Sequence, residues 1–350
     1  MKSFKKILSA ILPVGFTLML LIKNELCTEA LTSGISICLT VLAPSLFAFI
    51  FATSLLLESF GSVIGPLFAP VLCPIFNISS EACTPFILGL LGGFPAGAQI
   101  TGSIYSQGKI SKKEAERLLS FCNNAGPMFV IAAVGASVFG SSETGRLLYC
   151  VHIASAIIVG LVTRPLGYKF QKTSPSLKDA WNSCRIPSFK SLFPKCCASS
   201  VKLMSLICGN FLVFRVIIAL LSSANIIPIV PKEILNGIIE ITSGILSLPV
   251  TPGGIISASI LLGFGGLCVH MQTEYVLMDT GLSTTRYYIG KLLQGGISGS
   301  LTYVLLQNRI IEASGGFESI SSQALCLIAA AVLLLCLLSV IAGKKAAMHT

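Results

Sequence analysis

Charged residues are scarce in this chain of 350 residues: Asp, Glu, Lys and Arg make up 11%, whereas hydrophobic residues make up 53%. A water-soluble domain usually carries about 25% charged residues. The mean hydropathy of +0.86 points the same way. The composition excludes an ordinary soluble fold and favours a protein built into a lipid bilayer.

Motifs of known catalytic chemistry are also lacking. The sequence contains no HExxH zinc motif, no GxSxG nucleophile motif and no phosphate-binding loop, which excludes a self-contained ATP-driven pump. Most of the 13 cysteines lie in apolar runs without disulfide-scaffold spacing, as small buried hydrophobes do. Only Cys196-Cys197, beside a basic loop, leaves lipidation or metal binding open. We expect no enzyme, no metal site and no cofactor beyond a coupling ion such as a proton or sodium.

Positive charge is present and clustered, with a net charge of +10. Basic residues gather at the N-terminus, at 109–117, at 164–202 and at 344–345. An excess of Lys and Arg marks the cytoplasmic side of a membrane. We therefore assign the charge to the inner face, place both termini in the cytoplasm and infer no nucleic-acid partner.

Apolar periodicity predicts about eight membrane-spanning helices, each near the 17–25 residues that a crossing requires. The expected spans are roughly 7–22, 35–57, 118–140, 146–163, 200–222, 261–280, 286–306 and 323–343. The first is interpreted as a retained span, because no convincing cleavage site follows it.

Two stretches break this pattern. Pro66, Pro70 and Pro74 remove successive backbone donors, so we expect a broken segment at the membrane interface there. The stretch "LLGGFPAGAQITG" then places a Gly-Phe-Pro-Ala-Gly tip between two short helical halves. We interpret 84–108 as a re-entrant hairpin that turns back at mid-membrane depth.

A faint internal repeat predicts a second hairpin at 233–260, with Pro249, Pro252, Gly253 and Gly254 at its tip. The predicted fold is an all-α polytopic membrane protein whose two hairpin units form an inverted repeat, as in secondary transporters. Its parts are an N-terminal helix and external loop (1–34), a first unit (35–163), a basic cytoplasmic loop (164–199), a second, inverted unit (200–306) and a C-terminal helix (307–350).

Arg215 and Glu240 are ionisable residues in apolar surroundings. Each costs at least about 2.5 kcal/mol at the bilayer centre, so such a residue normally faces a cavity or a partner. A structural salt bridge between them, direct substrate or proton binding, and a shallow interfacial position all stay open.

Further polar residues lie near expected helix interruptions. Asn123 and Asn124 precede Gly126-Pro127, and an unwound, Asn-rich helix entry suits either ion or ligand binding or a cap with a packing kink. His270 and Gln272 could line the same cavity, whereas His152 is interpreted as packing. The candidate substrate-binding residues are Gly93, Pro95, Gly97, Gln99, Asn123, Asn124, Arg215, Glu240, Thr242, Ser243, Thr251, Gly253, Gly254, His270 and Gln272.

The stretches "GGFPAGAQITGSIYSQGKISKKEAERLLSFCNNAGPMFVIAAVG", "IIEITSG" and "LLGFGGLCVHMQTEYVL" resemble the YlbJ-type sporulation integral membrane proteins of the nucleoside-recognition (Gate) superfamily. The resemblance implies a fold similar to concentrative nucleoside transporters, with paired hairpins around a midplane site. For the sporulation branch it implies transport of dipicolinate, a small aromatic dicarboxylate, in endospore-forming bacteria, at the cytoplasmic or forespore membrane.

The leading hypothesis is a secondary transporter of a small organic anion that works by alternating access. Hairpin tips present helix N-termini that favour carboxylates, and Arg215 could add a charge-assisted contact. The alternatives are a non-transporting protein of spore-envelope (cortex) assembly and a nucleoside transporter. The expected partners are the lipid bilayer and a small anionic metabolite, and a homo-oligomer is compatible with the sequence.

Overall fold

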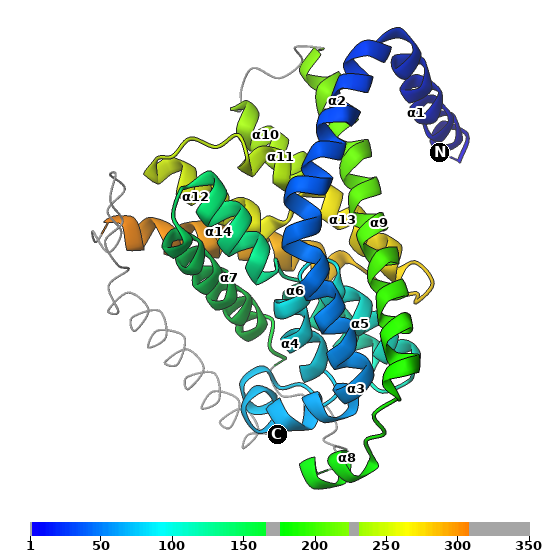
Figure 1. The fold of residues 1–350 in the computed structure, drawn as a ribbon, viewed down its shortest axis with the longest axis vertical. Coiled ribbons are helices and arrows are strands. Elements are labelled where there is room, and N and C mark those ends of the chain that lie inside the picture. The colour runs from blue at the N-terminus through cyan, green and yellow to red at the C-terminus, as the bar shows by residue number, and fades with distance from the viewer. Residues whose placement is uncertain (1, 166–175, 224–230, 308–350) are drawn as a thin grey trace.

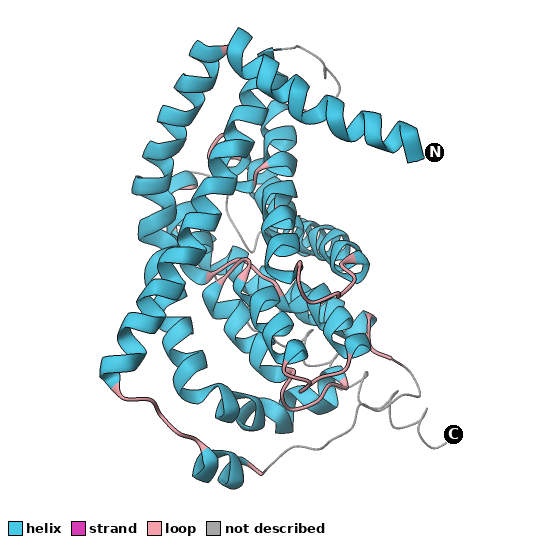
Figure 2. Ribbon diagram, turned by 90° about the vertical axis from the view of Figure 1, so that its right-hand side faces the viewer, coloured by secondary structure: helices cyan, strands magenta, loops and turns pink. Residues whose placement is uncertain are grey.

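The computed structural model describes residues 2–165, 176–223 and 231–307. Within these ranges the chain forms helices and no strands, which confirms the all-α class (Figure 2). Four described stretches are long and apolar enough to cross a membrane, namely Asn24–Phe76, Ser142–Val162, Phe189–Ser223 and Pro252–Leu277. The expected span at 323–343 lies outside the described residues, so the total of eight stays a prediction.

The N-terminal part consists of an outlying helix and a very long one. Helix α1 (Lys2–Ile22) projects from the body of the molecule. After a turn, α2 (Asn24–Ile37) runs toward the body (Figure 1). The π-helical turn η1 (Cys38–Leu42) joins α2 to α3 (Ala43–Phe76) without a gap. At 1.5 Å per residue this 53-residue helix measures about 80 Å, far more than a hydrocarbon core of about 30 Å.

The structure contradicts the expected break at the three prolines. Pro66, Pro70 and Pro74 all lie inside α3, which remains helical to Phe76. Their four-residue spacing puts them on one face, and this face is partly or fully exposed. The lost hydrogen bonds therefore fall on the outer side of a helix that bends around the core, where bending is least costly.

The first hairpin region contains two short helices that pack against each other, α4 (Cys83–Gly92) and α5 (Ala96–Ser106). Helix α6 (Lys112–Cys122) follows and ends before the non-helical stretch 123–126. The chain resumes as the π-helix η2 (Phe129–Val138) and then α7 (Ser142–Val162). The expected span at 118–140 is thus an interrupted helix.

The second unit follows α8 (Leu177–Ser183) and α9 (Phe189–Ser223). It consists of α10 (Lys232–Ile239), α11 (Ile241–Ile245), α12 (Pro252–Phe264), α13 (Gly266–Leu277) and α14 (Thr285–Gln307). The expected span at 261–280 is interrupted at Gly265, which has φ +93°. The element order repeats that of the first unit: a short helix pair, an interrupted helix and a long helix.

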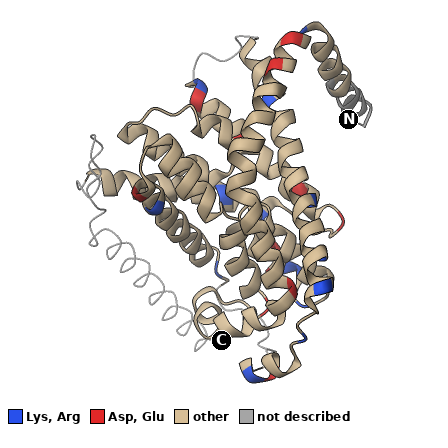
Figure 3. Ribbon diagram, viewed as in Figure 1, with Lys and Arg blue, Asp and Glu red and all other residues tan. Residues whose placement is uncertain are grey.

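The short helix pairs of the two units lie toward opposite ends of the molecule. Helices α4 and α5 lie toward the end of the molecule that carries α8, whereas α10 and α11 lie toward the turn between α1 and α2 (Figure 1). Most charged residues lie near helix ends and loops, and few lie in the middle (Figure 3). This distribution suits a protein whose middle is embedded in lipid.

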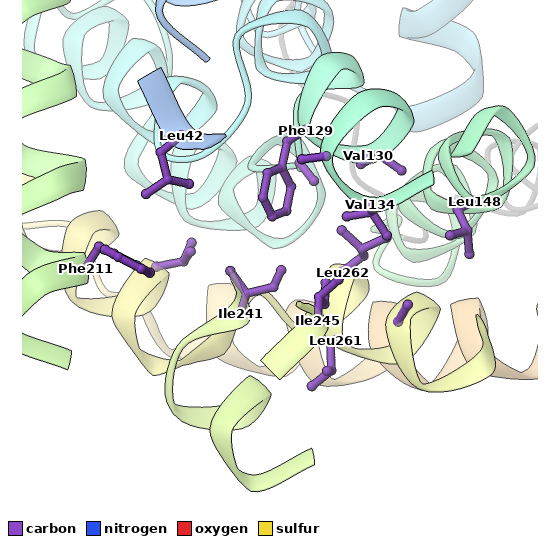
Figure 4. Close-up of a cluster of buried hydrophobic side chains, with 14 of the residues drawn as sticks. Leu42, Phe129, Val130, Val134, Leu148, Phe211, Ile241, Ile245, Leu261 and Leu262 are labelled. Atoms are coloured by element: carbon purple, nitrogen blue, oxygen red, sulfur yellow. The ribbon is translucent and has the colours of Figure 1, made fainter. Parts of the chain in front are cut away.

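The largest hydrophobic cluster joins both units. Phe129, Val130 and Val134 of η2 face Ile241 and Ile245 of α11 and the buried leucines of α12 (Figure 4). The long helices approach closely in both units, since Gly135 of η2 abuts Gly145 of α7, and Gly263 of α12 abuts Gly295 of α14. Small residues allow such backbone contacts between membrane helices.

Candidate functional site

Four interruptions of the helices meet in the middle of the molecule: the turn 93–95, the stretch 123–126, Glu240 and Gly265. A Cβ built on Gly93 would lie 3.0 Å from the nitrogen of Gly126, and one on Gly265 would lie 3.4 Å from the ring of Phe94. A Cβ built on Gly266 would lie 3.0 Å from the carbonyl oxygen of Gly237 in α10 and 3.1 Å from the nitrogen of Ile241 in α11. Non-helical backbone at membrane depth is tolerated only inside protein or beside a cavity.

A cavity of about 50 Å³ lies among these interruptions. Its polar lining comes from Glu240, Thr242 and Gln272, three of the residues singled out from the sequence. The rest of the lining is mainly apolar and comprises Leu42, Leu46, Phe94, Ala125, Gly126, Phe129, Ile207, Phe211, Ile241, Cys268 and Val269. Since a water molecule occupies about 30 Å³ of liquid, the cavity suits a water or a small ion and not an organic acid.

Lys291 of α14 is the most unusual residue at this centre, because its side chain is fully buried. Its Nζ donates to the carbonyl oxygen of Asn123 at 2.9 Å and to Oε1 of Gln294 at 2.6 Å. The ammonium also lies 4.9 Å from the ring centroid of Phe94, in a cation–π contact. Lys291 thereby connects the second unit to both interruptions of the first.

No described carboxylate pairs with Lys291. The ion pairs in the described ranges join Lys112 to Glu116, Arg146 to Glu143 and Lys195 to Glu58, all at more exposed positions. A buried charge without a counter-charge is costly unless hydrogen bonds compensate for the lost water. The described partners of the Lys291 amino group are therefore two oxygen atoms and an aromatic ring.

The two asparagines extend the network around Lys291. Asn124 accepts a hydrogen bond from Nε2 of Gln294 at 2.9 Å and donates to the carbonyl oxygen of Phe121 at 2.8 Å. Asn123 donates to Thr273 at 3.0 Å and accepts from the backbone N–H of Ala98 at 3.4 Å. Both side chains are fully buried, and their hydrogen bonds connect the interrupted helix to α5, α13 and α14.

The histidines lie on either side of this network. His270 contacts the hydroxyl of Tyr287 at 2.8 Å, and Tyr287 in turn accepts from Thr273 at 3.2 Å. Nε2 of His152 accepts the N–H of Ala125 at 3.0 Å. The interpretation of His152 as plain packing is therefore corrected, since it satisfies a backbone donor inside the interruption 123–126. One buried ring nitrogen of each histidine has no partner among the described residues.

Glu240 lies between α10 and α11 and caps the latter. Its two carboxylate oxygens accept the backbone N–H groups of Thr242 at 2.9 Å and Ser243 at 2.6 Å. The side chain is 2% exposed. The protein's own carboxylate thus occupies the start of α11.

Arg215 does not pair with Glu240 in the described structure, which contradicts the salt-bridge interpretation. Its guanidinium donates to Ser33 at 3.0 Å and to Ser243 at 3.5 Å. Arg215 is half-buried and does not line the cavity. Ser243 links it indirectly to the backbone that Glu240 caps.

The residues of the first hairpin tip have different environments. Gly93 and Pro95 are buried at the turn, and the Phe94–Pro95 peptide bond is cis. Gly97 lies so close to the carbonyl oxygen of Cys122 that an added Cβ would be 2.1 Å from it. Gln99 is exposed on the outer side of α5 and takes no part in the site.

The residues expected at the second tip lie elsewhere. Thr251 and Gly253 are exposed at the start of α12, and Gly254 is packed under the carbonyl oxygen of Pro249. None of the three lines the cavity, and the hydroxyl of Thr251 caps its own helix through the N–H of Gly254. The interruption next to the cavity is Glu240, about ten residues earlier in the chain.

Sequence reasoning missed Lys291, Gln294, Thr273 and Phe94. A signal for Lys291 existed, because "RYYIGKLLQGG" places a lysine inside the expected span 286–306. Gln294 follows three residues later, on the same face of a helix. In the described ranges, no three His, Cys, Asp or Glu side chains gather where they could hold a metal ion.

Comparison with known proteins gives one informative match. The chain is 30% identical to the sporulation integral membrane protein YlbJ of Bacillus subtilis (strain 168), over 76% of this chain and 74% of that protein. No family model matches the chain. No solved structure matches it either. The identity extends over most of both proteins, and the apolar helices fit an integral membrane protein. The chain therefore belongs to the YlbJ family of sporulation integral membrane proteins.

Proposed function

We propose that this protein is a secondary transporter of a small organic anion during spore formation, with dipicolinate as its substrate. The observation that carries the proposal is the crossing of four helix interruptions at a buried cavity with a polar network. Transporters of several folds bind their substrates near the bilayer midplane at such interrupted helices. Its sporulation role follows from the family.

The charge at the centre supports an anionic substrate. Lys291 brings a positive charge beside the cavity without a paired carboxylate, and Phe94 contacts both the ammonium and the cavity. A fixed positive charge in a low-dielectric site attracts a carboxylate more strongly than it would in water. Glu240 also lines the cavity and would disfavour a negatively charged group next to it.

The alternating-access part of the proposal includes an inverted repeat of the Gate type. The two units share one order of elements and enter the body from different sides (Figure 1). Attaching an impermeant thiol reagent to single cysteines tests this arrangement. Cysteines at Lys112 and Lys190 should react from the cytoplasm, and a cysteine at Lys232 from outside. Reaction of all three from one side would contradict the inversion.

The size of the cavity assigns this conformation to a closed state in the proposed cycle. A volume of about 50 Å³ cannot hold an aromatic dicarboxylate, so the units must separate before the substrate enters. The interface between η2 and α11 is where they would part, because the side chains that meet there are apolar (Figure 4).

Uptake by proteoliposomes tests the function. Labelled dipicolinate should accumulate in vesicles that contain the protein, and unlabelled dipicolinate should compete while nucleosides should not. Lys291→Met should abolish uptake, whereas Lys232→Met, at an exposed lysine on α10, should not. Competition by nucleosides alone would move the assignment to nucleoside transport.

A role in spore-envelope assembly is the second candidate, and the same small cavity favours it. A membrane protein that only binds partners can fill its centre with side chains, as most of this centre is filled. No uptake of either substrate class by correctly folded protein, together with a cortex defect in cells that lack it, would favour this alternative.

A further inference from the structure

The end of α6 is a place that favours a cation. The helix ends at Cys122, and its C-terminal carbonyl groups carry the negative end of the helix dipole. Pro127 has no N–H, so the carbonyl of Asn123, four residues earlier, lacks a helical donor. In transporters with interrupted helices, unwound carbonyls and half-helix C-terminal ends are where Na⁺ or protons bind.

The side chain of Lys291 fills this place. Its ammonium has a backbone carbonyl oxygen at 2.9 Å, an amide oxygen at 2.6 Å and an aromatic face at 4.9 Å. Gln294 is itself fixed, because its Nε2 donates to Asn124 at 2.9 Å and to the carbonyl oxygen of His152 at 3.3 Å. The oxygen ligands are of the kind that hard cations take.

We propose that Lys291 is a tethered cation that occupies the position a coupling Na⁺ would take at the end of α6, so that the protein folds and works without Na⁺. The ammonium comes from α14 of the second unit, and its ligands include the interruption of the first. The claim that the protein transports its substrate without Na⁺ rests on the proposed transport function. The claim that Lys291 fills a cation position does not depend on it.

Two substitutions separate the charge of Lys291 from its volume. Lys291→Ala removes the ammonium and leaves the oxygen ligands around an opened space. Lys291→Met removes the ammonium but keeps most of the side chain, so the space stays filled. If the position is a cation site, Na⁺ should enter the alanine variant and not the methionine variant.

Thermal unfolding of the purified full-length protein, in NaCl or in choline chloride at equal concentration, makes this measurable. Wild type and the exposed-lysine control Lys232→Ala should have the same Tm in both salts. Lys291→Ala should have a lowered Tm in choline chloride and recover most of the loss in NaCl, since a ligand that binds only the folded state stabilises it. Lys291→Met should have a lowered Tm in both salts.

Three outcomes would overturn the inference: a wild-type Tm that rises in NaCl over choline chloride, a Lys291→Ala protein that is equally destabilised in both salts, or wild-type uptake that requires Na⁺. If Lys291→Ala yields no protein, Lys291→Ser takes its place with the same expectation. Failure of wild-type vesicles to take up dipicolinate would overturn the proposed function alone, because the Tm comparison does not depend on transport.

Discussion

The interruption after α6 and the interruption at Glu240 are satisfied in different ways. After α6, the groups that complete the site come from far along the chain, since Lys291 and Gln294 belong to α14. At Glu240, one side chain caps the helix that begins directly after it. The first interruption depends on how the two units are docked, whereas the second is locally complete. We therefore expect the first to sense movement between the units and the second to stay fixed.

The largest expected effect comes from Lys291→Met, which removes the long-range contact at the interruption after α6. The carbonyl oxygen of Asn123 and Oε1 of Gln294 each lose a donor in a buried setting. At about 1–3 kcal/mol per unsatisfied group, the free energy of unfolding in detergent should fall by about 2–6 kcal/mol. Lys232→Met serves as the exposed control, and an equal loss in both variants would contradict the assignment.

Gly97→Ala should have the next largest effect, because it pushes the hairpin away from α6. The new Cβ would lie 2.1 Å from the carbonyl oxygen of Cys122, so backbone must move. Overpacking of this kind costs about 1–3 kcal/mol. Gly253→Ala is the matched control, since its nearest neighbour is 3.9 Å away. Circular dichroism melts of both variants make the comparison, and an unchanged Gly97→Ala melt would refute the close contact.

Glu240→Gln tests the locally satisfied interruption and should be milder. Glutamine keeps one oxygen that can accept from the backbone, so we expect a loss of about 0.5–2 kcal/mol, as for other helix caps. Glu25→Gln, at an exposed position on α2, is the control. A loss larger than that of Lys291→Met would reverse our ranking of the two interruptions.

Arg215→Met should have the smallest effect of the four. It removes hydrogen bonds to Ser33 and Ser243 at a half-buried site, the second of them 3.5 Å long, so we expect a loss of about 0.5 kcal/mol in total. The double variant Arg215→Met/Glu240→Gln should show a coupling energy below about 1 kcal/mol, because the residues share only Ser243. Recovery of stability in the double variant would instead reveal the salt bridge that the structure lacks.

Several features could be predicted from the sequence for clear physical reasons. The scarcity of charge indicates a membrane protein, and "GGFPAGAQ" indicates a turn between short helices, because two glycines and a proline within four residues disfavour a continuous helix. Pro127 indicates a freed carbonyl at Asn123, and the structure places a donor there.

Other features needed the three-dimensional structure. Three prolines on one exposed face of α3 bend the helix without ending it, and sequence spacing alone does not say which face is exposed. The second unit was misaligned with the first by about ten residues, because Pro249, Pro252 and the following glycines imitate a hairpin tip on the surface. Counting lysines as markers of the cytoplasmic side drew attention away from Lys291, the lysine at the centre.

The dependence of the first interruption on α14 has a consequence for biogenesis. A lysine in the middle of a membrane helix resists insertion by about 2.5–3.5 kcal/mol when the helix is alone. Helix α14 leaves the ribosome after α6 and α7, so the carbonyl oxygen of Asn123, which accepts from its ammonium, and the amide oxygen of Asn124, which accepts from Gln294, are already in the membrane when it arrives. Its entry into the bilayer and its docking onto the first unit are then one coupled event, and a ribosome that stops before residue 291 leaves the first unit with its interruption unsatisfied.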